Sequence, residues 1–427
     1  MNKGLIVALV LVLLLPVIAS TQLAQPVAGE VLKSDKERIT SPDVSASEQA
    51  LLVGGNSAFA FELYQVLKEE GGNLFYSPYS ISLALAMTYA GARGDTAQQM
   101  ADALRFMLEQ DRLHSAFNWL DAELAKRGEG AQGKDGEGFR LNIVNAIWGQ
   151  KEYEFLPTFL DVLAENYGAG LRILDFITET EKSRLTINDW VSDQTEGRIE
   201  DLIPQGAIDA LTRLVLTNAI YFNAAWENPF NKDITADGPF YLLDGGQVTV
   251  PMMKQTEAFG YTEGEGYQAV ELLYNGDELS MVILLPEAGE FEAFEEGLQA
   301  QQVCDIINSL QLTAVALTMP QFEFDSEFSL RDTLAEMGMP IAFSSDADFS
   351  GMTGNRELFI SDVVHKAFVA VDEAGTEAAA ATAVIMKLTA VPEPPVEVNI
   401  DRPFIFLIRD IETGAVLFIG RVLNPGA

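Results

Sequence analysis

The residues that could do chemistry in this chain are few, because its 427 residues include two histidines and one cysteine. A hydrolase of the Ser-His-Asp or Cys-His type needs a histidine as its base, so His114 or His365 would have to fill that role. His114 lies in a pattern typical of a helix surface, and His365 lies in a strand-like run. The sequence has no Gly-x-Ser-x-Gly, His-Glu-x-x-His, phosphate-binding glycine loop or paired-cysteine metal motif. We therefore expect no catalytic residues, no metal site and no cofactor, and a hydrolase using one of the histidines is the alternative.

One long segment near the C-terminus fits neither a helix nor a strand of the surrounding pattern. It follows the predicted strand around Phe368 to Val371, precedes a strand that starts near Val396, and covers residues 372–395. It begins Asp-Glu-Ala-Gly-Thr-Glu-Ala-Ala-Ala-Ala-Thr and ends Val-Pro-Glu-Pro-Pro. A loop of this length within a compact domain is usually functional or disordered. Composition alone favours a helix or a disordered linker, since alanine is the best helix former.

The elements that must hold this segment are predicted to form one α+β domain without an internal repeat. Helical periodicity predicts three helices, at Asn56 (as N-cap) to Leu67, at Ile81 to Ala92 and at Ile187 to Ile203. Alternation predicts strands at residues 139–148, 269–274, 279–285, 404–408 and 416–423. The pairs that flank Asn275-Gly276 and Thr413-Gly414 are predicted hairpins.

The N-terminus predicts export. Residues 1–20 have the layout of a signal peptide, with an apolar run from Leu5 to Val17 that is short for a membrane span. Residues 21–48 are rich in Pro, Ser, Ala and charge, which predicts a flexible linker before a domain at 49–427. We expect an extracellular protein, with retention by an uncleaved N-terminal segment as the alternative. The single Cys304 excludes an intramolecular disulfide, and we expect it to be buried.

The charge balance limits the partners. The chain has 63 acidic and 27 basic residues, which give a formal net charge of -36. A polyanion of this size repels nucleic acid and acidic membrane surfaces. The simplest interpretation is a well-solvated, highly soluble surface, and attraction of basic partners is the alternative.

Read with its flanks, the long segment makes the chain resemble the serpin family from about Asn56 to Pro425. The matching stretches, in the family's order, are Asn73-Leu-Phe-Tyr-Ser-Pro-Tyr-Ser-Ile-Ser, Ile187-Asn-Asp-Trp-Val with Thr195-Glu-Gly-Arg-Ile, Leu216-Thr-Asn-Ala-Ile-Tyr-Phe with Trp226-Glu-Asn-Pro-Phe, Val250-Pro-Met-Met, Asp348-Phe-Ser-Gly-Met, His365-Lys-Ala, Glu373-Ala-Gly-Thr-Glu-Ala-Ala-Ala-Ala-Thr and Asp401-Arg-Pro-Phe-Ile-Phe. Export without disulfides or an Asn-x-Ser/Thr sequon suggests a secreted, prokaryotic-type member. The resemblance implies a single unit of about nine helices and three β-sheets with an exposed reactive centre loop.

The resemblance also implies a mechanism. In inhibitory serpins a target protease attacks the loop and forms an acyl-enzyme, and the freed loop then inserts into a sheet and distorts the protease. The inhibitor is consumed, so the implied activity is that of a suicide substrate. We expect a monomer whose partner is a serine or cysteine protease, with no nucleic acid and no small-molecule substrate. The alternative within the family is a non-inhibitory serpin with a binding or chaperone-like role.

The loop hinge implied by the resemblance is Glu373, Gly375, Thr376, Glu377, Ala378, Ala379, Ala380, Ala381 and Thr382. A segment that becomes a buried strand should alternate faces and keep charge off the inward face. From Thr376 the inward face carries no ionisable group, whereas Glu377 and Lys387 fall on the other face. The inward residues are Thr376, Ala378, Ala380, Thr382, Val384, Met386 and Leu388.

Counting fifteen residues with Gly375 as the first, as in the family, places the reactive bond at Thr389-Ala390. Thr389 suits an elastase-like or subtilisin-like pocket. The alternatives are Leu388, for a chymotrypsin-like or cysteine protease, and Lys387, for a trypsin-like one.

A second group of residues resembles the region where the family's sheet opens. Ser77, Ser80, Asn218 and His365 match the polar cluster below the opening, and Trp226 matches the aromatic residue at its top. A buried, hydrogen-bonded histidine is consistent with both a structural and a switching role. Trp226 fits ordinary core packing equally well.

Overall fold

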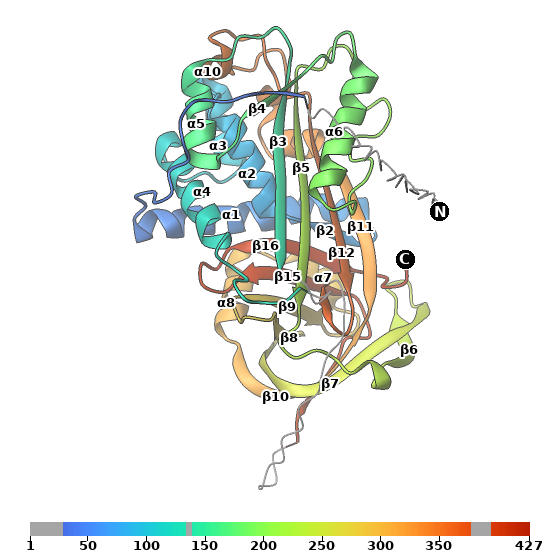
Figure 1. Ribbon diagram of the computed structural model, residues 1–427. Coiled ribbons are helices and arrows are strands. Elements are labelled where there is room, and N and C mark those ends of the chain that lie inside the picture. Colours follow the sequence, from blue (N-terminus) through green and yellow to red (C-terminus); the bar gives the residue numbers. More distant parts are fainter. Residues whose placement is uncertain (1–28, 134–138, 377–393) are drawn as a thin grey trace, which may run out of the picture.

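The structure is a computed structural model, and it describes residues 29–133, 139–376 and 394–427 (Figure 1). Its α-helices are α1 (Ala46–Leu67), α2 (Pro78–Tyr89), α3 (Gly94–Ala103), α4 (Gln110–Leu124), α5 (Pro157–Tyr167), α6 (Thr180–Gln194), α7 (Phe291–Glu296), α8 (Ala300–Asn308), α9 (Arg331–Glu336) and α10 (Ser350–Thr353). Its strands are β1 (Glu30–Leu32), β2 (Leu74–Tyr76), β3 (Arg140–Gln150), β4 (Leu171–Leu174), β5 (Leu214–Ala225), β6 (Ala236–Tyr241), β7 (Gln247–Gly264), β8 (Tyr267–Leu273), β9 (Leu279–Pro286), β10 (Gln311–Pro320), β11 (Phe322–Ser329), β12 (Asp362–Val371), β13 (Gly375–Thr376), β14 (Val396–Asn399), β15 (Phe404–Asp410) and β16 (Val416–Val422). No helix within these ranges is both long and apolar enough to cross a membrane.

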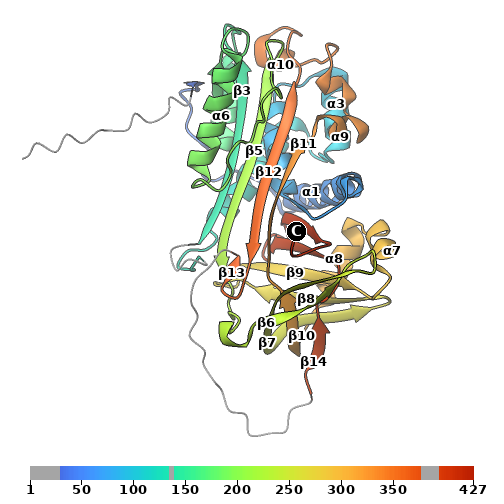
Figure 2. The ribbon, with the colours of Figure 1, turned by 90° about the vertical axis from the view of Figure 1, so that its right-hand side faces the viewer.

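The site is built on a seven-stranded sheet with the order β1-β4-β3-β5-β13-β12-β11. Its long central strands run along the body of the molecule (Figure 1). In Figure 2 this sheet separates α6 from α1, α3 and α9. Strand β5 is buried along nearly its whole length, as expected for a central strand covered on both faces.

The second sheet has nine strands, and its path runs β14-β10-β7-β8-β9-β15-β16-β2, with β6 paired to β7. The 18-residue strand β7 pairs with β6 near its start and with β8 near its end. Because β7 is continuous, two of the three expected sheets are joined into one. Both predicted hairpins, β8–β9 and β15–β16, are confirmed.

Helix α6 covers the long sheet through a core of its own. Ile187 and Val191 on α6 pack with Trp148 of β3, and the guanidinium carbon of Arg172 lies 4.3 Å from the ring centre of Trp190. The helix predicted over residues 187–203 instead ends at Gln194. Glu196 and Gly197 have φ values of 55° and 76°, outside the helical region, so the chain turns back and buries the apolar residues that follow.

The N-terminal segment differs from its prediction. Residues 29–45 were expected to form part of a flexible linker, yet β1 pairs with β4 and Arg38 bonds Asp121 of α4 at 2.6 Å. The segment is attached through its backbone and charges, so it shows no apolar period. Helix α1 begins at Ala46, capped by Ser45 and Glu48. Asn56, the predicted cap, lies inside this helix and is buried.

Candidate functional site

The centre of the site is the two-residue strand β13, which lies between β5 and β12 (Figure 2). It runs antiparallel to both neighbours, with Thr376 opposite Val371 of β12 and Ala224 of β5, and Gly375 opposite Ala225. The start of the predicted loop hinge is therefore already a strand of the sheet.

The turn that leads into β13 is held by hydrogen bonds from neighbouring backbone and side chains. Trp226 donates its backbone N–H to the carbonyl of Ala374 at 2.9 Å and its indole Nε1–H to that of Asp372 at 3.0 Å. The carboxylate of Glu373, which is 5% exposed, accepts a hydrogen bond from the Thr235 hydroxyl at 2.6 Å. These contacts hold the turn that precedes β13.

Gly375 is required where it lies. Its φ of 153° is unfavourable for other residues, and a Cβ there would lie 2.2 Å from the carbonyl oxygen of Ala224. The sequence suggested Gly375 as a flexible pivot. The structure adds a second reason for glycine, because β5 approaches too closely for any side chain.

Thr376 begins the inward face. Its side chain is 2% exposed, and its hydroxyl lies 2.9 Å from the hydroxyl of Tyr274. Tyr274 stacks on Trp226 with ring centres 4.7 Å apart, and Phe222 meets Tyr274 edge-on at 5.0 Å. Burial raises the pKa of Tyr274 well above its usual value, so this phenol stays neutral and able to donate. Trp226 is thus both a core residue and a hinge contact.

Beyond the hinge the sheet is closed. Strands β5 and β12 pair with each other in parallel, from Val215 opposite Asp362 to Ile220 opposite Ala367. This pairing stops there, and on each of the two strands three residues separate its end from the residue that pairs with Thr376. A longer strand in the line of β13 can enter only if these six pairs separate.

A buried polar cluster includes one pair of this segment, Asn218 and His365. It joins α2, β3, β5 and β12 through Ser77, Ser80, Asn145, Asn218 and His365. Asn218 donates its amide to Ser80 Oγ at 2.6 Å and accepts a hydrogen bond from the ring of His365. The four predicted cluster residues are therefore brought together, and all are fully buried.

Neither Asn145 nor Tyr274 was predicted from the sequence. Asn145 pairs with Asn218 across β3 and β5. It falls between Ile143 and Ile147 on the face that packs against the main core, so a polar residue at an apolar position was a usable signal. Tyr274 ends a predicted strand, and nothing local marks it as a hinge contact.

The protonation of His365 follows from its partners. The backbone N–H of Ser77 donates to Nε2 at 3.2 Å, so Nε2 carries no proton and Nδ1–H donates to Asn218. Burial lowers the pKa of His365 to about 3, and the hydrogen bond with Asn218 raises it by less. The ring is neutral at physiological pH.

His114 and Cys304 do not lie where the sequence placed them. His114 is buried, not on a helix surface, and its Nδ1 lies 2.7 Å from the hydroxyl of Tyr167. Burial lowers the pKa of His114 to about 4. Cys304, expected to be buried, is exposed on α8 because the apolar face of that short helix is formed by Val303 and Ile306.

The other predicted loop residues lie outside the described ranges. They are Glu377, Ala378, Ala379, Ala380, Ala381, Thr382, Lys387, Leu388, Thr389 and Ala390.

The sequence and the fold of this chain are both similar to those of known proteins. The family model described as Serpin (serine protease inhibitor) matches residues 54–425. Leukocyte elastase inhibitor of Bos taurus is 43% identical over 385 residues, which cover 88% of this chain and 99% of that protein. An uncharacterized serpin-like protein of Thermococcus kodakarensis is 40% identical over 376 residues, 88% of this chain and 86% of that protein. The crystal structure of tengpin, a thermophilic serpin in its native state, matches with a TM-score of 0.79 at 30% identity, covering 92% of this chain and 97% of that one.

Proposed function

Because this chain belongs to the serpin family, we propose that it inhibits serine proteases as a suicide substrate that traps them by loop insertion. The target protease attacks the loop that follows Thr376 and forms an acyl-enzyme. The freed loop then inserts between β5 and β12 and carries the protease across the molecule before the ester hydrolyses. Cysteine proteases that form a thioester are a second class of target.

The observation that carries the proposal is the position of β13. Gly375 and Thr376 already pair with strands on both sides, at the end of the sheet where β5 and β12 are not paired with each other. Insertion therefore extends an existing strand, and no first pairing between the loop and the sheet has to form. Extension is easier than nucleation, because the entropy of bringing the strands together has already been lost.

The register of β13 defines the inserted product. If this pairing continues in the same register, the sixth residue after Thr376 lies opposite the sixth residue before Ala224 on β5 and the sixth residue before Val371 on β12. That residue is Thr382, and its new neighbours are Asn218 and His365, which now pair with each other. Insertion thus breaks the hydrogen bond between Asn218 and His365 and brings a hydroxyl to the same polar cluster.

The proposed target is an elastase-like or subtilisin-like protease that cleaves between Thr389 and Ala390. The similarity to leukocyte elastase inhibitors supports this class, because a small P1 residue such as threonine fits a small S1 pocket. Cleavage after Leu388 or Lys387 would instead indicate a chymotrypsin-like or trypsin-like target.

A protease panel tests the proposal. The purified chain is mixed with elastase, subtilisin, chymotrypsin, trypsin and a papain-like cysteine protease, and the products are separated in denaturing detergent. We expect a detergent-stable species with the summed mass of chain and protease, and sequencing of the released peptide gives the cleaved bond. A chain that is cleaved without forming such a species with any protease is a non-inhibitory serpin, and the proposal is then wrong.

We also propose that residues 1–20 direct export and that the protein acts outside the cell as a monomer. N-terminal sequencing of protein from the culture medium tests the export, because a new N-terminus near Thr21 indicates cleavage. An intact N-terminus in the membrane fraction would indicate retention instead.

A further inference from the structure

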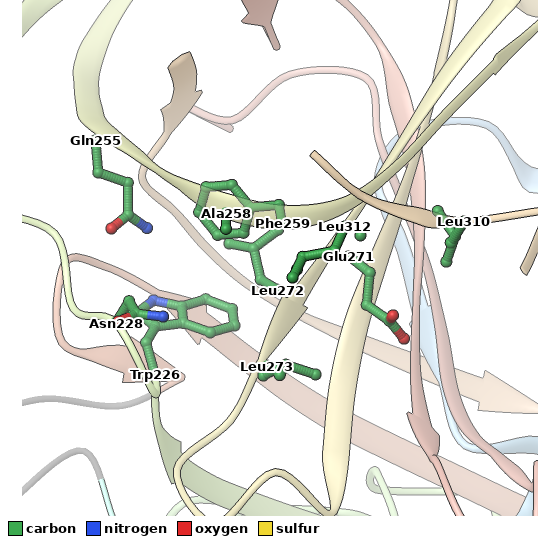
Figure 3. Close-up of a pocket in the computed structure, with 11 residues that line it drawn as sticks. Trp226, Asn228, Gln255, Ala258, Phe259, Glu271, Leu272, Leu273, Leu310 and Leu312 are labelled. Carbon is green, nitrogen blue, oxygen red and sulfur yellow. The ribbon is translucent and has the colours of Figure 1, made fainter. Parts of the chain in front are cut away.

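A cavity of about 230 Å³ lies beside Trp226, against β7, β8 and β10 (Figure 3). Phe259, Leu272 and Leu312 are among the residues that line it, and Leu312 is 81% exposed. An apolar cavity of ~150 Å³ in another protein is large enough to bind benzene. This cavity therefore has room for a ligand of one or two fused rings.

One polar group in the wall has no partner of its own. The amide nitrogen of Gln255 is buried and makes no hydrogen bond to any residue in the described ranges. Figure 3 shows this amide pointing toward Trp226 and Asn228, on the same side of the cavity. A buried donor without an acceptor is costly, so an acceptor on a ligand would be favoured at this position.

Charge selects a neutral ligand. The carboxylate of Glu271 lines the cavity and already accepts hydrogen bonds from Ser280 at 2.7 Å and from Arg409 at 3.0 Å. The second of these contacts is a salt bridge that compensates the charge of Glu271, so an anion is disfavoured mainly by the net charge of -36 of the chain. The acceptor that faces Gln255 is therefore an uncharged carbonyl and not a carboxylate.

The cavity is connected to the hinge through aromatic contacts. Trp226 lines it, stacks on Tyr274 and donates to the carbonyl of Asp372. Tyr274 in turn bonds Thr376 and contacts Phe222 of β5. When β5 moves away from β12 to admit a strand, Phe222 moves with it against this stack. Close-packed groups can shift only where space is left, and the cavity beside Trp226 is such a space.

We propose that this cavity binds a small neutral aromatic molecule with a carbonyl group, and that its occupation slows loop insertion. The second part rests on the proposed inhibitory function, and the first does not. The ligand is a regulator and is not consumed.

Two probes of matched shape test the binding. Calorimetry compares 2-acetylnaphthalene with 2-ethylnaphthalene, which lacks the carbonyl. We expect the ketone to bind about fivefold more tightly, as one hydrogen bond allows, and Gln255→Leu to abolish this preference. Ala258→Phe, at an exposed position of the wall, should abolish binding of both probes, whereas Leu243→Phe on a different surface should not. Equal binding of the ketone to the wild type and to Ala258→Phe would overturn the site.

The regulation is tested on the rate of protease complex formation. Saturating 2-acetylnaphthalene should lower this rate at least threefold and raise the fraction of chain that is cleaved without being trapped. Ala258→Phe should form the complex slowly even without ligand, and the ketone should not change its rate. Leu243→Phe should form the complex at the wild-type rate and respond to the ketone as the wild type does. If saturating 2-acetylnaphthalene leaves the rate of complex formation unchanged, the proposed regulation is wrong, although the binding site is not contradicted. A chain that binds the ketone but traps no protease overturns the proposed function, and with it the regulation.

Discussion

In the proposed mechanism insertion starts at Thr376, whose side chain is already buried against Tyr274. We expect Thr376→Arg to convert the inhibitor into an ordinary substrate. A guanidinium has no partner for its charge at this buried position, so we expect residue 376 of the intact variant to leave the sheet, and its return during insertion then costs several kcal/mol. A cost of about 3 kcal/mol slows insertion about 100-fold, so deacylation overtakes it. The stoichiometry of inhibition, measured by titration of the protease, should rise at least tenfold.

The matched control at this position is Thr376→Val, which keeps the volume and removes the hydroxyl. It should retain complex formation, with a loss of about 1 kcal/mol of stability from the missing hydrogen bond to Tyr274. Complex formation by Thr376→Arg at the wild-type level would contradict the inward position of this side chain during insertion.

His365 makes stability depend on pH in a direction that its environment determines. Its pKa is about 3 in the folded protein and about 6.5 in an unfolded chain. Between these values the unfolded chain binds a proton that the folded protein does not. Stability therefore falls as pH falls from 6.5, by about 1.4 kcal/mol per pH unit from this residue. We expect His365→Gln to take up about one proton fewer than the wild type on unfolding in urea at pH 5.5, measured by potentiometric titration.

His114 provides the control for this measurement, because its pKa is also lowered, to about 4. His114→Gln should likewise lose about one proton of uptake, and the double variant about two. Only His365→Gln should also change the rate of protease trapping, since only His365 bonds across β5 and β12. Wild-type proton uptake by His365→Gln would mean that the ring is charged in the folded protein.

Single residues of the site were predictable to different degrees. Asn218 and His365 are far from each other and from Ser77 and Ser80 in the sequence, so only the family resemblance indicated that these four residues form the cluster that the hydrogen bonds join. Contacts such as Tyr274 with Thr376 depend on the packing of two sheets, which local patterns do not contain.

At the scale of the element, the register of β13 decides which loop residue meets which part of the sheet. If Thr382 reaches Asn218 and His365, its hydroxyl is satisfied by the polar cluster. We expect Thr382→Val to lower the free energy of unfolding of the cleaved form by about 1 kcal/mol and to leave the uncleaved form unchanged. Urea unfolding of both forms measures the difference.

A second substitution, Ala380→Ser, places a hydroxyl two residues earlier on the same face of the strand. In the same register residue 380 faces Ile220 and Ala367, both buried and apolar. Ala380→Ser should therefore destabilise the cleaved form, because its hydroxyl finds no partner there. If Thr382→Val had no effect on the cleaved form and Ala380→Ser stabilised it, the pairing of β13 could not continue in its present register.

Elements were predictable where the local signal is strong. The strands β8 and β9 were found because Asn275-Gly276 forms a tight turn between alternating runs. The start of α1 and the end of α6 were missed for opposite reasons. The first turns of α1 carry little apolar period, whereas the segment after Gln194 keeps helical spacing but folds back beneath the helix. Tertiary packing, not propensity, sets both boundaries.

For the whole molecule, the pairing of the described sheet leads us to expect a metastable native state. Strands β5 and β12 pair with each other over six residues, although a strand placed between them would pair on both of its edges. Adding that strand forms more than ten backbone hydrogen bonds, each worth roughly 1 kcal/mol net. This sum is comparable to the total stability of many domains. The uncleaved chain is therefore expected to occupy a local minimum, held by the paired segment and the polar cluster.

Cleavage of the loop tests this expectation directly, since it frees the segment after Thr376 to insert without a trapped protease. We expect cutting between Lys387 and Ala390 to raise the thermal midpoint on the order of 10 °C. This value follows from about 10 kcal/mol gained and an unfolding entropy of roughly 0.8 kcal/mol per kelvin for a chain of this length. Scanning calorimetry of intact and cleaved protein measures it. Thr376→Arg, cleaved in the same way, should show a rise smaller by roughly a third, because about 3 of the 10 kcal/mol gained is lost in burying the guanidinium. Equal midpoints for the intact and cleaved wild-type chain would show that the loop stays outside the sheet and that the native state is not metastable.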